Sequence, residues 1–237
     1  MIRVAMLISF AVFQEAAAAE LNHLQPILAK PGKVVLDMDF ETDFVVDKNH
    51  KSFVCGQGTT WKAKQGMLVG TESSPEYQAK KKAQGNGHLG TAPRLQIRDS
   101  PRDVILKYSF KIVGGKGTKL LPMIEAGHHL RRIYFGSDGS QILVDHEKKA
   151  IAKSDFVLQQ DQWYHVMIEI KGDEFLVRFQ DGPTIYASDP GVGADFANYT
   201  IGITATDKGT IYIDNLAMWD VADIRPSWAS VKANLAP

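Results

Sequence analysis

The chain has 237 residues, with 27 Lys and Arg against 27 Asp and Glu, and 44% of the residues are hydrophobic. These values are ordinary for a globular protein and exclude a disordered, collagen-like or coiled-coil chain. The formal net charge is zero. This balance argues against nucleic acid or an anionic membrane surface as the main partner, because proteins that bind either of them carry a basic excess.

Residues 1–19 are typical of a secretory signal peptide. Arg3 supplies the basic start, residues 4–13 form an apolar run, and Ala16–Ala19 provide a small-residue cleavage site. The apolar run is too short for a membrane span, which needs about 20 residues. We therefore expect cleavage after Ala19, with the two preceding alanines as alternatives. The sequence predicts an exported protein, periplasmic or extracellular, without a membrane span.

Cys55 is the single cysteine, so no disulfide can form within the chain. Its neighbours Phe53, Val54 and Gly56 predict a small buried residue near a turn. A reactive thiol is the alternative, and it is less favoured because no His or second Cys lies beside it in the sequence.

Strand signals run through residues 34–221, after a lead segment at 20–33 that is broken by Pro26 and Pro31. Apolar residues recur at every second position and Gly-containing turns separate the runs, which predicts an all-β sandwich or barrel. We expect the Lys-rich patch at 80–82 to be a solvated loop. The C-terminal tail, 222–237, is expected to hold the only helix, a short one that begins at Ser227. In the second half of the chain we expect strands at Leu120–Glu125, His128–Phe135, Gln141–His146, Trp163–Ile170, Phe175–Gln180, Thr184–Ala187, Thr200–Thr206 and Thr210–Trp219.

Several motifs occur together in a characteristic order: LDMDFE at 36–41, GTTWK at 58–62, GMLVG at 66–70, WYH at 163–165 and IYIDNL at 211–216. In this order the sequence resembles the concanavalin A-like lectin/glucanase superfamily. Within it, the chain is most similar to secreted bacterial laminin-G-like domains that are grouped with 3-keto-disaccharide hydrolases. The resemblance spans residues 34–221 and implies a jelly roll of two antiparallel sheets with a short helical tail.

The resemblance implies a protein that binds a saccharide or polysaccharide on one sheet face. The alternatives are a glycoside hydrolase of the 3-keto-disaccharide hydrolase-like type, with His and Glu or a divalent cation in catalysis, and a surface interaction domain that binds no sugar. The Glu-x-Asp-x-Glu motif of family 16 glycosidases does not occur in this sequence. Whether the protein is an enzyme therefore stays open at this point.

Two polar stretches supply the candidate ligand-binding residues. The first is 125–132, EAGHHLRR, in which Arg131 or Arg132 could bind ligand oxygens. The second is the strand from Trp163, whose alternate side chains form an aromatic and polar face, with Arg178 expected on the neighbouring strand. If the two stretches pair as neighbouring strands, they line one groove; the alternatives are exposed strand residues and a cross-strand ion pair between Glu169 and Arg178. The predicted ligand-binding set is Glu125, His129, Arg131, Trp163, His165, Glu169 and Arg178.

Acidic residues alternate at 37, 39, 41 and 43 along the first expected strand. The resemblance implies that this strand and the Asp of the last strand can bind a structural Ca²⁺, which gives Asp39, Glu41 and Asp214 as the predicted metal ligands. Three alternatives stay open: a charged sheet edge that opposes aggregation, a catalytic row of carboxylates, and a local turn-capping role for Asp214.

Overall fold

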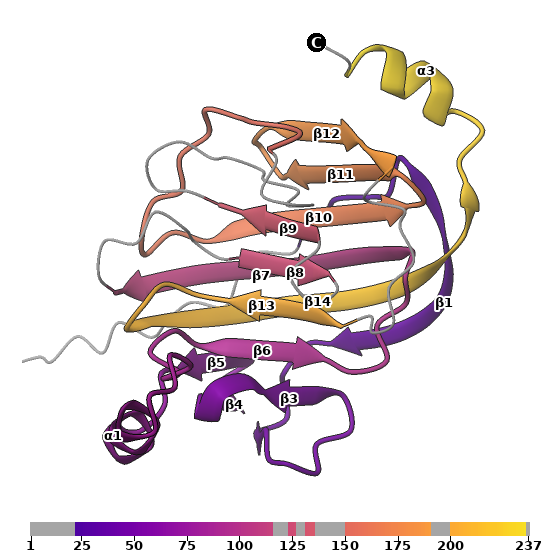
Figure 1. Ribbon diagram of the computed structural model, residues 1–237. Coiled ribbons are helices and arrows are strands. Elements are labelled where there is room, and N and C mark those ends of the chain that lie inside the picture. The colour runs from indigo at the N-terminus through magenta and orange to yellow at the C-terminus, as the bar shows by residue number, and fades with distance from the viewer. Residues whose placement is uncertain (1–21, 116–122, 127–130, 136–149, 191–199, 236–237) are drawn as a thin grey trace, which may run out of the picture.

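The computed structural model describes residues 22–115, 123–126, 131–135, 150–190 and 200–235. Within these ranges the chain forms two antiparallel sheets that pack face to face (Figure 1). The expected signal peptide and the expected strand Gln141–His146 lie outside the described residues.

Sheet A has nine strands among the described residues, and the long β14 runs through its middle (Figure 1). β1 (Ala29–Met38) pairs with the second half of β14, beyond the stretch at which β5 pairs. In spatial order the other strands of the sheet are β12 (Thr184–Ser188), β11 (Glu174–Phe179), β10 (Tyr164–Lys171), β7 (Val104–Gly114), β14 (Gly209–Ile224), β5 (Met67–Thr71), β4 (Thr60–Lys64) and β2 (Phe44–Val45).

Sheet B has five strands in the described part of the chain, and it covers one face of sheet A. A short 3-10 turn, η1 (Gly56–Gly58), follows its first strand in the sequence. In spatial order the strands are β3 (Phe53–Cys55), β6 (Arg94–Ile97), β13 (Ile201–Thr204), β8 (Met123–Ala126) and β9 (Arg131–Tyr134).

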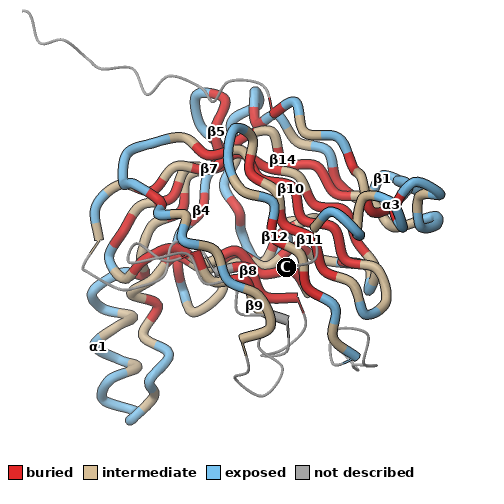
Figure 2. Tube along the Cα trace, turned by 90° about the horizontal axis from the view of Figure 1, so that it is seen from above, coloured by how far each residue is buried: buried red, intermediate tan, exposed pale blue. Residues whose placement is uncertain are grey.

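The main hydrophobic core lies between the two sheets, where buried residues of both sheets meet (Figure 2). On β10 the core side chains are Tyr164, Val166, Ile168 and Ile170. This is the set that the period-two pattern predicts, because successive side chains of a strand point to opposite faces. The residues that alternate with them, His165, Met167 and Glu169, therefore lie on the outer face of sheet A.

A second, smaller apolar cluster covers part of that outer face. Leu28 and Ala29, just ahead of the regular part of β1, pack there with Met167 of β10 and Trp228. Trp228 begins α3 (Trp228–Ala233), the short C-terminal helix that the sequence predicts. Sheet A is therefore covered on one face by sheet B and over part of the other by the two ends of the described chain.

The Lys-rich patch at 80–82 is helical, so the prediction of a loop was wrong. It belongs to α1 (Pro75–Ala83), which projects from the edge of the sandwich (Figure 1). The Ser74 side chain accepts a hydrogen bond from the Tyr77 backbone N–H, and Pro75 occupies the first helical position. These are standard signals for the start of a helix. No residue of α1 is buried, so the sequence has no apolar periodicity here that would have indicated a helix.

The acidic alternation at 37–43 does not continue along one strand. β1 ends at Met38, and Phe40 has a φ of 58°, so the chain turns there. Asp37 lies in β1 on an exposed position, whereas Asp39, Glu41 and Asp43 follow in the irregular segment. The prediction of a row of carboxylates on one strand face was therefore wrong, because the left-handed backbone at Phe40 ends the strand.

Candidate functional site on the outer face of sheet B

A polar surface covers the side of sheet B that faces away from the core. On β6, β8, β9 and β13 the core residues are isoleucines, Leu95 and Ala126, so the residues that alternate with them point outward. We call this surface the sheet-B face. Its described residues are Arg94, Gln96, Glu125, Arg132, Tyr134, Gly202 and Thr204.

The strand register places four of these residues in one row across the sheet. Gly202 pairs with Gln96 on one side and with Glu125 on the other, and Glu125 pairs with Arg132. Gly202 has no side chain, so the middle of the row forms a floor between polar neighbours, and the residue itself is buried. The same register places Arg94 beside Thr204, one step along the strands.

Glu125 is the centre of this surface. Its side chain is buried, and its two carboxylate oxygens face two arginines: Oε2 lies 2.7 Å from Nη2 of Arg94 and Oε1 lies 3.4 Å from Nη2 of Arg132. Nη1 of Arg132 also donates to the Tyr134 hydroxyl at 2.9 Å. Burying a carboxylate is costly unless it is paired and hydrogen-bonded, so the two arginines offset the cost of burying Glu125, and Glu125 holds them in place.

Arg94 is positioned by packing as well as by charge. A side chain at Gly56 would meet the Cγ and Cδ atoms of Arg94 at 2.9 Å, so the glycine of η1 leaves the space that the Arg94 stem occupies. The guanidinium reaches diagonally from β6 across β13 to Glu125 on β8. In the described part of the chain this is the only hydrogen bond that the Arg94 guanidinium donates.

This arrangement suits binding of an oxygen-rich ligand. A guanidinium has five N–H donors in a fixed plane, and it binds carboxylate or hydroxyl pairs with defined geometry. The Arg94 side chain keeps 17% of its accessible surface. Glu125 is the only carboxylate among the described outward residues of the sheet-B strands. Glycoside hydrolysis usually needs two carboxylates, and the described part of this face supplies one.

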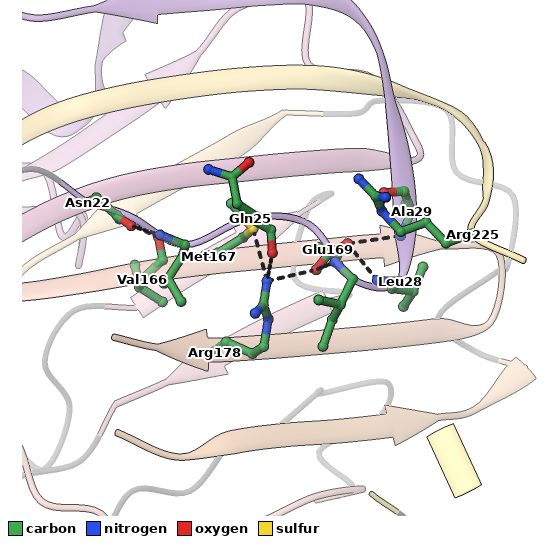
Figure 3. A network of polar contacts seen from close by, with 11 residues as sticks. Asn22, Gln25, Leu28, Ala29, Val166, Met167, Glu169, Arg178 and Arg225 are labelled. Carbon is green, nitrogen blue, oxygen red and sulfur yellow. Dashed lines mark hydrogen bonds and ion pairs between the residues drawn. The ribbon is translucent and has the colours of Figure 1, made fainter. Parts of the chain in front are cut away.

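Two predicted ligand residues, Glu169 on β10 and Arg178 on β11, lie elsewhere, on the outer face of sheet A, and there they bind the N-terminal segment (Figure 3). We call residues 22–29 the N-terminal strap. The fully buried Glu169 carboxylate accepts backbone N–H bonds from Ile27, Leu28 and Ala29 at 3.0, 3.0 and 2.9 Å. Glu169 therefore replaces the sheet partners that these backbone donors lack.

Arg178 completes this network (Figure 3). Its Nη2 lies 3.5 Å from Oε1 of Glu169 and donates to the backbone carbonyl of Gln25. Burial lowers the pKa of Arg178, and the Glu169 carboxylate opposes that shift. The ion pair that the sequence suggested as an alternative is present, and the strap covers it.

The strap is also fixed at its first described residue. The Asn22 side-chain amide donates to the backbone carbonyls of Tyr108 and Val166, at 3.2 and 3.3 Å, and Nζ of Lys107 donates to the Asn22 carbonyl. Asn22 keeps only 2% of its accessible surface. A saccharide could reach Glu169 in this structure only if the strap left.

Trp163 and His165 lie further along the same outer face. The Lys111 ammonium is 5.6 Å from the centre of the Trp163 ring and 5.2 Å from that of Tyr212. His165 Nδ1 lies 2.7 Å from the hydroxyl of Ser109, which is itself fully buried. Both predicted residues are thus half-buried and engaged with neighbouring strands of sheet A.

The expected common groove does not form, because its strands are in different sheets. β9 pairs with β8 in sheet B, whereas β10 pairs with β7 and β11 in sheet A. Sequence periodicity assigns a residue to a face of its own strand but does not say which sheet the strand joins. His129 lies outside the described residues, and of Arg131 only the backbone position on β9 is described.

The predicted calcium ligands are placed as follows. β1 and β14 pair, as expected, but Asp39 lies just beyond β1 and its Oδ1 accepts the Glu41 N–H. Asp214 is buried on β14 and accepts the Asn215 N–H at 2.6 Å, which matches the local capping role. Among the described residues no group of three or more His, Cys, Asp or Glu side chains could hold a metal ion. Calcium at these residues stays a prediction that rests on the resemblance.

Cys55 is half-buried at the end of β3. Its thiol donates to the Val46 carbonyl at 3.3 Å, and burial raises the pKa of the thiol. A raised pKa keeps the group as the less reactive thiol, which agrees with a structural role.

Sequence analysis missed Arg94, Gln96 and the floor at Gly202. They come from β6 and β13, which are separated by about 100 residues of chain, and only the sheet register brings them beside Glu125. A usable signal was present in the RLQI run of β6, where polar residues alternate with core residues.

The two antiparallel sheets and their strand order form a jelly-roll sandwich. Solved structures with this fold include an endo-β-1,3(4)-glucanase of family GH16, with 11% identity, a TM-score of 0.56, and coverage of 82% of this chain and 96% of the glucanase. A protein of unknown function with a galectin-like fold from Bacillus subtilis has 8% identity, a TM-score of 0.56, and coverage of 81% and 98%.

A carbohydrate binding module, CBM66 of Bacillus subtilis, has 15% identity, a TM-score of 0.50, and coverage of 73% of this chain and 98% of the module. At these identities the likeness concerns the fold. No protein-family model matches the sequence, and no curated protein matches it. In the described part of the chain, no helix has both the length and the apolar character to cross a membrane.

Proposed function

We propose that this protein is an exported saccharide-binding protein that binds its ligand on the sheet-B face. The observation that carries the proposal is the Arg94–Glu125–Arg132 cluster, in which a buried carboxylate on the strand next to Gly202 orients two arginines. Oriented N–H donors are what a saccharide, with its many hydroxyl oxygens, requires.

The fold is consistent with this proposal but does not carry it. The names of two structural neighbours, a carbohydrate binding module and an endo-β-1,3(4)-glucanase, give carbohydrate as their ligand class. The signal-peptide pattern at residues 1–19 supports export to the periplasm or the extracellular space.

Hydrolysis of a 3-keto-disaccharide or another glycoside is the second candidate, and it draws on the family resemblance alone. Binding is favoured because Glu125 is held as an ion-pair partner of two arginines. Hydrolysis by a pair of carboxylates also needs a second acid, and Glu125 is the only carboxylate among the described outward residues of the sheet-B strands.

A glycan array probed with the purified mature protein tests the proposal, followed by calorimetric titration of each saccharide that binds. Arg94→Ala should weaken binding at least about tenfold, the equivalent of about 1.4 kcal/mol for a charge-assisted contact. Arg102→Ala, a change at an exposed arginine outside the sheet-B face, is the matched control and should bind like the wild type. Failure of the wild type to bind any saccharide, or equal affinities for both variants, would contradict the proposal.

A further inference from the structure

The charge of the sheet-B face differs from that of the whole chain. The chain has no net charge, whereas the described ionisable groups at the outward strand positions of the face are two arginines and one glutamate. The glutamate side chain keeps 4% of its accessible surface, but the arginine side chains keep 17% and 16%. A ligand that reaches this face therefore meets guanidinium groups.

The side chains of Arg94 and Gln96 keep N–H donors that no described residue accepts. The Arg94 guanidinium gives one hydrogen bond, to Glu125, among the interactions of the described chain, and that bond uses only one of its two terminal nitrogens. The neighbouring Gln96 amide is half-exposed and makes no side-chain hydrogen bond within the described residues. Arg94 and Gln96 point outward from the same strand, two positions apart, so their donors can serve one ligand.

Stacking surface is scarce by comparison. Tyr134 is the only aromatic residue among the described outward positions of the sheet-B strands, and its hydroxyl accepts a hydrogen bond from Arg132. A site for a neutral sugar usually relies on apolar and aromatic side chains for most of its contact area. A site built from arginines beside a glycine floor gains more from a negative group, because charge-assisted hydrogen bonds are about twice as strong as neutral ones.

We infer that the ligand of the sheet-B face is an anionic saccharide, whose carboxylate or sulfate group binds Arg94. Glu125 does not compete for the ligand, because its buried carboxylate fixes the inner side of the guanidinium and leaves the other nitrogens for an oxyanion. This inference rests on the proposed function and narrows its ligand class.

Two matched pairs of polysaccharides test it by calorimetric titration. Polygalacturonate and its fully methyl-esterified form differ in the carboxylate charge, and dextran sulfate and dextran differ in the sulfate. We expect one acidic member to bind at least about tenfold more tightly than its neutral partner. We also expect Arg94→Gln to remove this difference. The pair that shows the preference tells whether the group is a carboxylate or a sulfate.

Non-specific attraction is controlled with α1, whose exposed lysines lie outside the sheet-B face. The triple variant Lys80→Gln, Lys81→Gln, Lys82→Gln should keep the preference. The inference is overturned if neutral and acidic members bind equally, or if the preference survives Arg94→Gln and disappears in the lysine variant. Equal binding of both members would leave the proposed saccharide function intact, whereas binding of no polysaccharide, together with an empty glycan array, would refute that function.

Discussion

Glu169 and Leu28 are 141 residues apart in the sequence, yet the Glu169 carboxylate accepts the Leu28 backbone N–H at 3.0 Å. With the bonds from the two flanking residues of the strap, this contact turns a charged strand residue into the anchor of the N-terminal segment (Figure 3). This contact therefore gives the outer face of sheet A around Glu169 a structural role, because the strap occupies the surface that a ligand would need.

Removing the charge of Glu169 should destabilise the protein. Glu169→Gln keeps the shape of the side chain but directs an amide group at backbone donors and leaves Arg178 without its ion-pair partner. Loss of one member of a buried pair costs about 3 kcal/mol. We expect urea denaturation to show a fall of that order in the free energy of unfolding. Asp173→Asn, at an exposed acid in the following turn, is the control and should have almost no effect.

His50 should make stability depend on pH. Its ring stacks on Phe53, and its Nδ1 accepts the N–H groups of Ser52 and Phe53, so the neutral ring is required. Burial lowers the pKa of His50 below its ordinary value of 6.5, although Asp47 opposes the shift.

The unfolded chain therefore binds a proton at His50 at a higher pH than the folded protein does. The contribution of His50 is complete above pH 6.5 and declines as the pH falls through the lower folded pKa. The difference in unfolding free energy between wild type and His50→Asn, measured from pH 8 to 5, should shrink in that window. A constant difference would contradict this role.

Tyr108 offers a change that should not destabilise the fold. Its hydroxyl is buried in the main core without a hydrogen-bond partner among the described residues, and burial raises its pKa well above 10.0. An unsatisfied buried polar group costs about 1–3 kcal/mol. Tyr108→Phe should therefore melt at the same or a higher temperature than the wild type. A large fall in the melting temperature would show that the hydroxyl has a partner.

Two substitutions at Gly202 should affect the stability of the fold and ligand binding on the sheet-B face differently. A Cβ atom there would lie 3.6 Å from the Leu95 carbonyl and 3.9 Å from the Glu125 Cβ, which are ordinary contacts. Gly202→Ala should keep or raise stability by about 0.5–1 kcal/mol, because glycine weakens a strand. Gly202→Leu should raise the floor and weaken saccharide binding. Unchanged affinity in the leucine variant would place the ligand away from this row.

Local patterns predicted the fold class well. The alternation of core residues on β10 is as expected, and so is the C-terminal helix at Trp228. The helix α1 was missed because none of its residues is buried and it lacks an apolar stripe. The acidic alternation misled because Phe40, at a φ of 58°, ends the regular strand geometry.

The site was only partly predictable, because its geometry depends on contacts distant in the sequence. Glu125 could be selected from its polar segment, but its partner Arg94 is on a strand that joins β8 only through β13. Glu169 looked equally suitable as a ligand residue. Nothing in its own strand indicates that residues 22–29 return to cover it.

Hydrogen exchange of the mature protein, with and without a saccharide that the array identifies, tests the central claim most directly. The account predicts slower exchange on binding in the peptides of β6, β8 and β13, around Arg94, Glu125 and Gly202, with Glu169 and its strap unchanged. Protection confined to β10, β11 and residues 22–29 would contradict it, because it would place the ligand on sheet A.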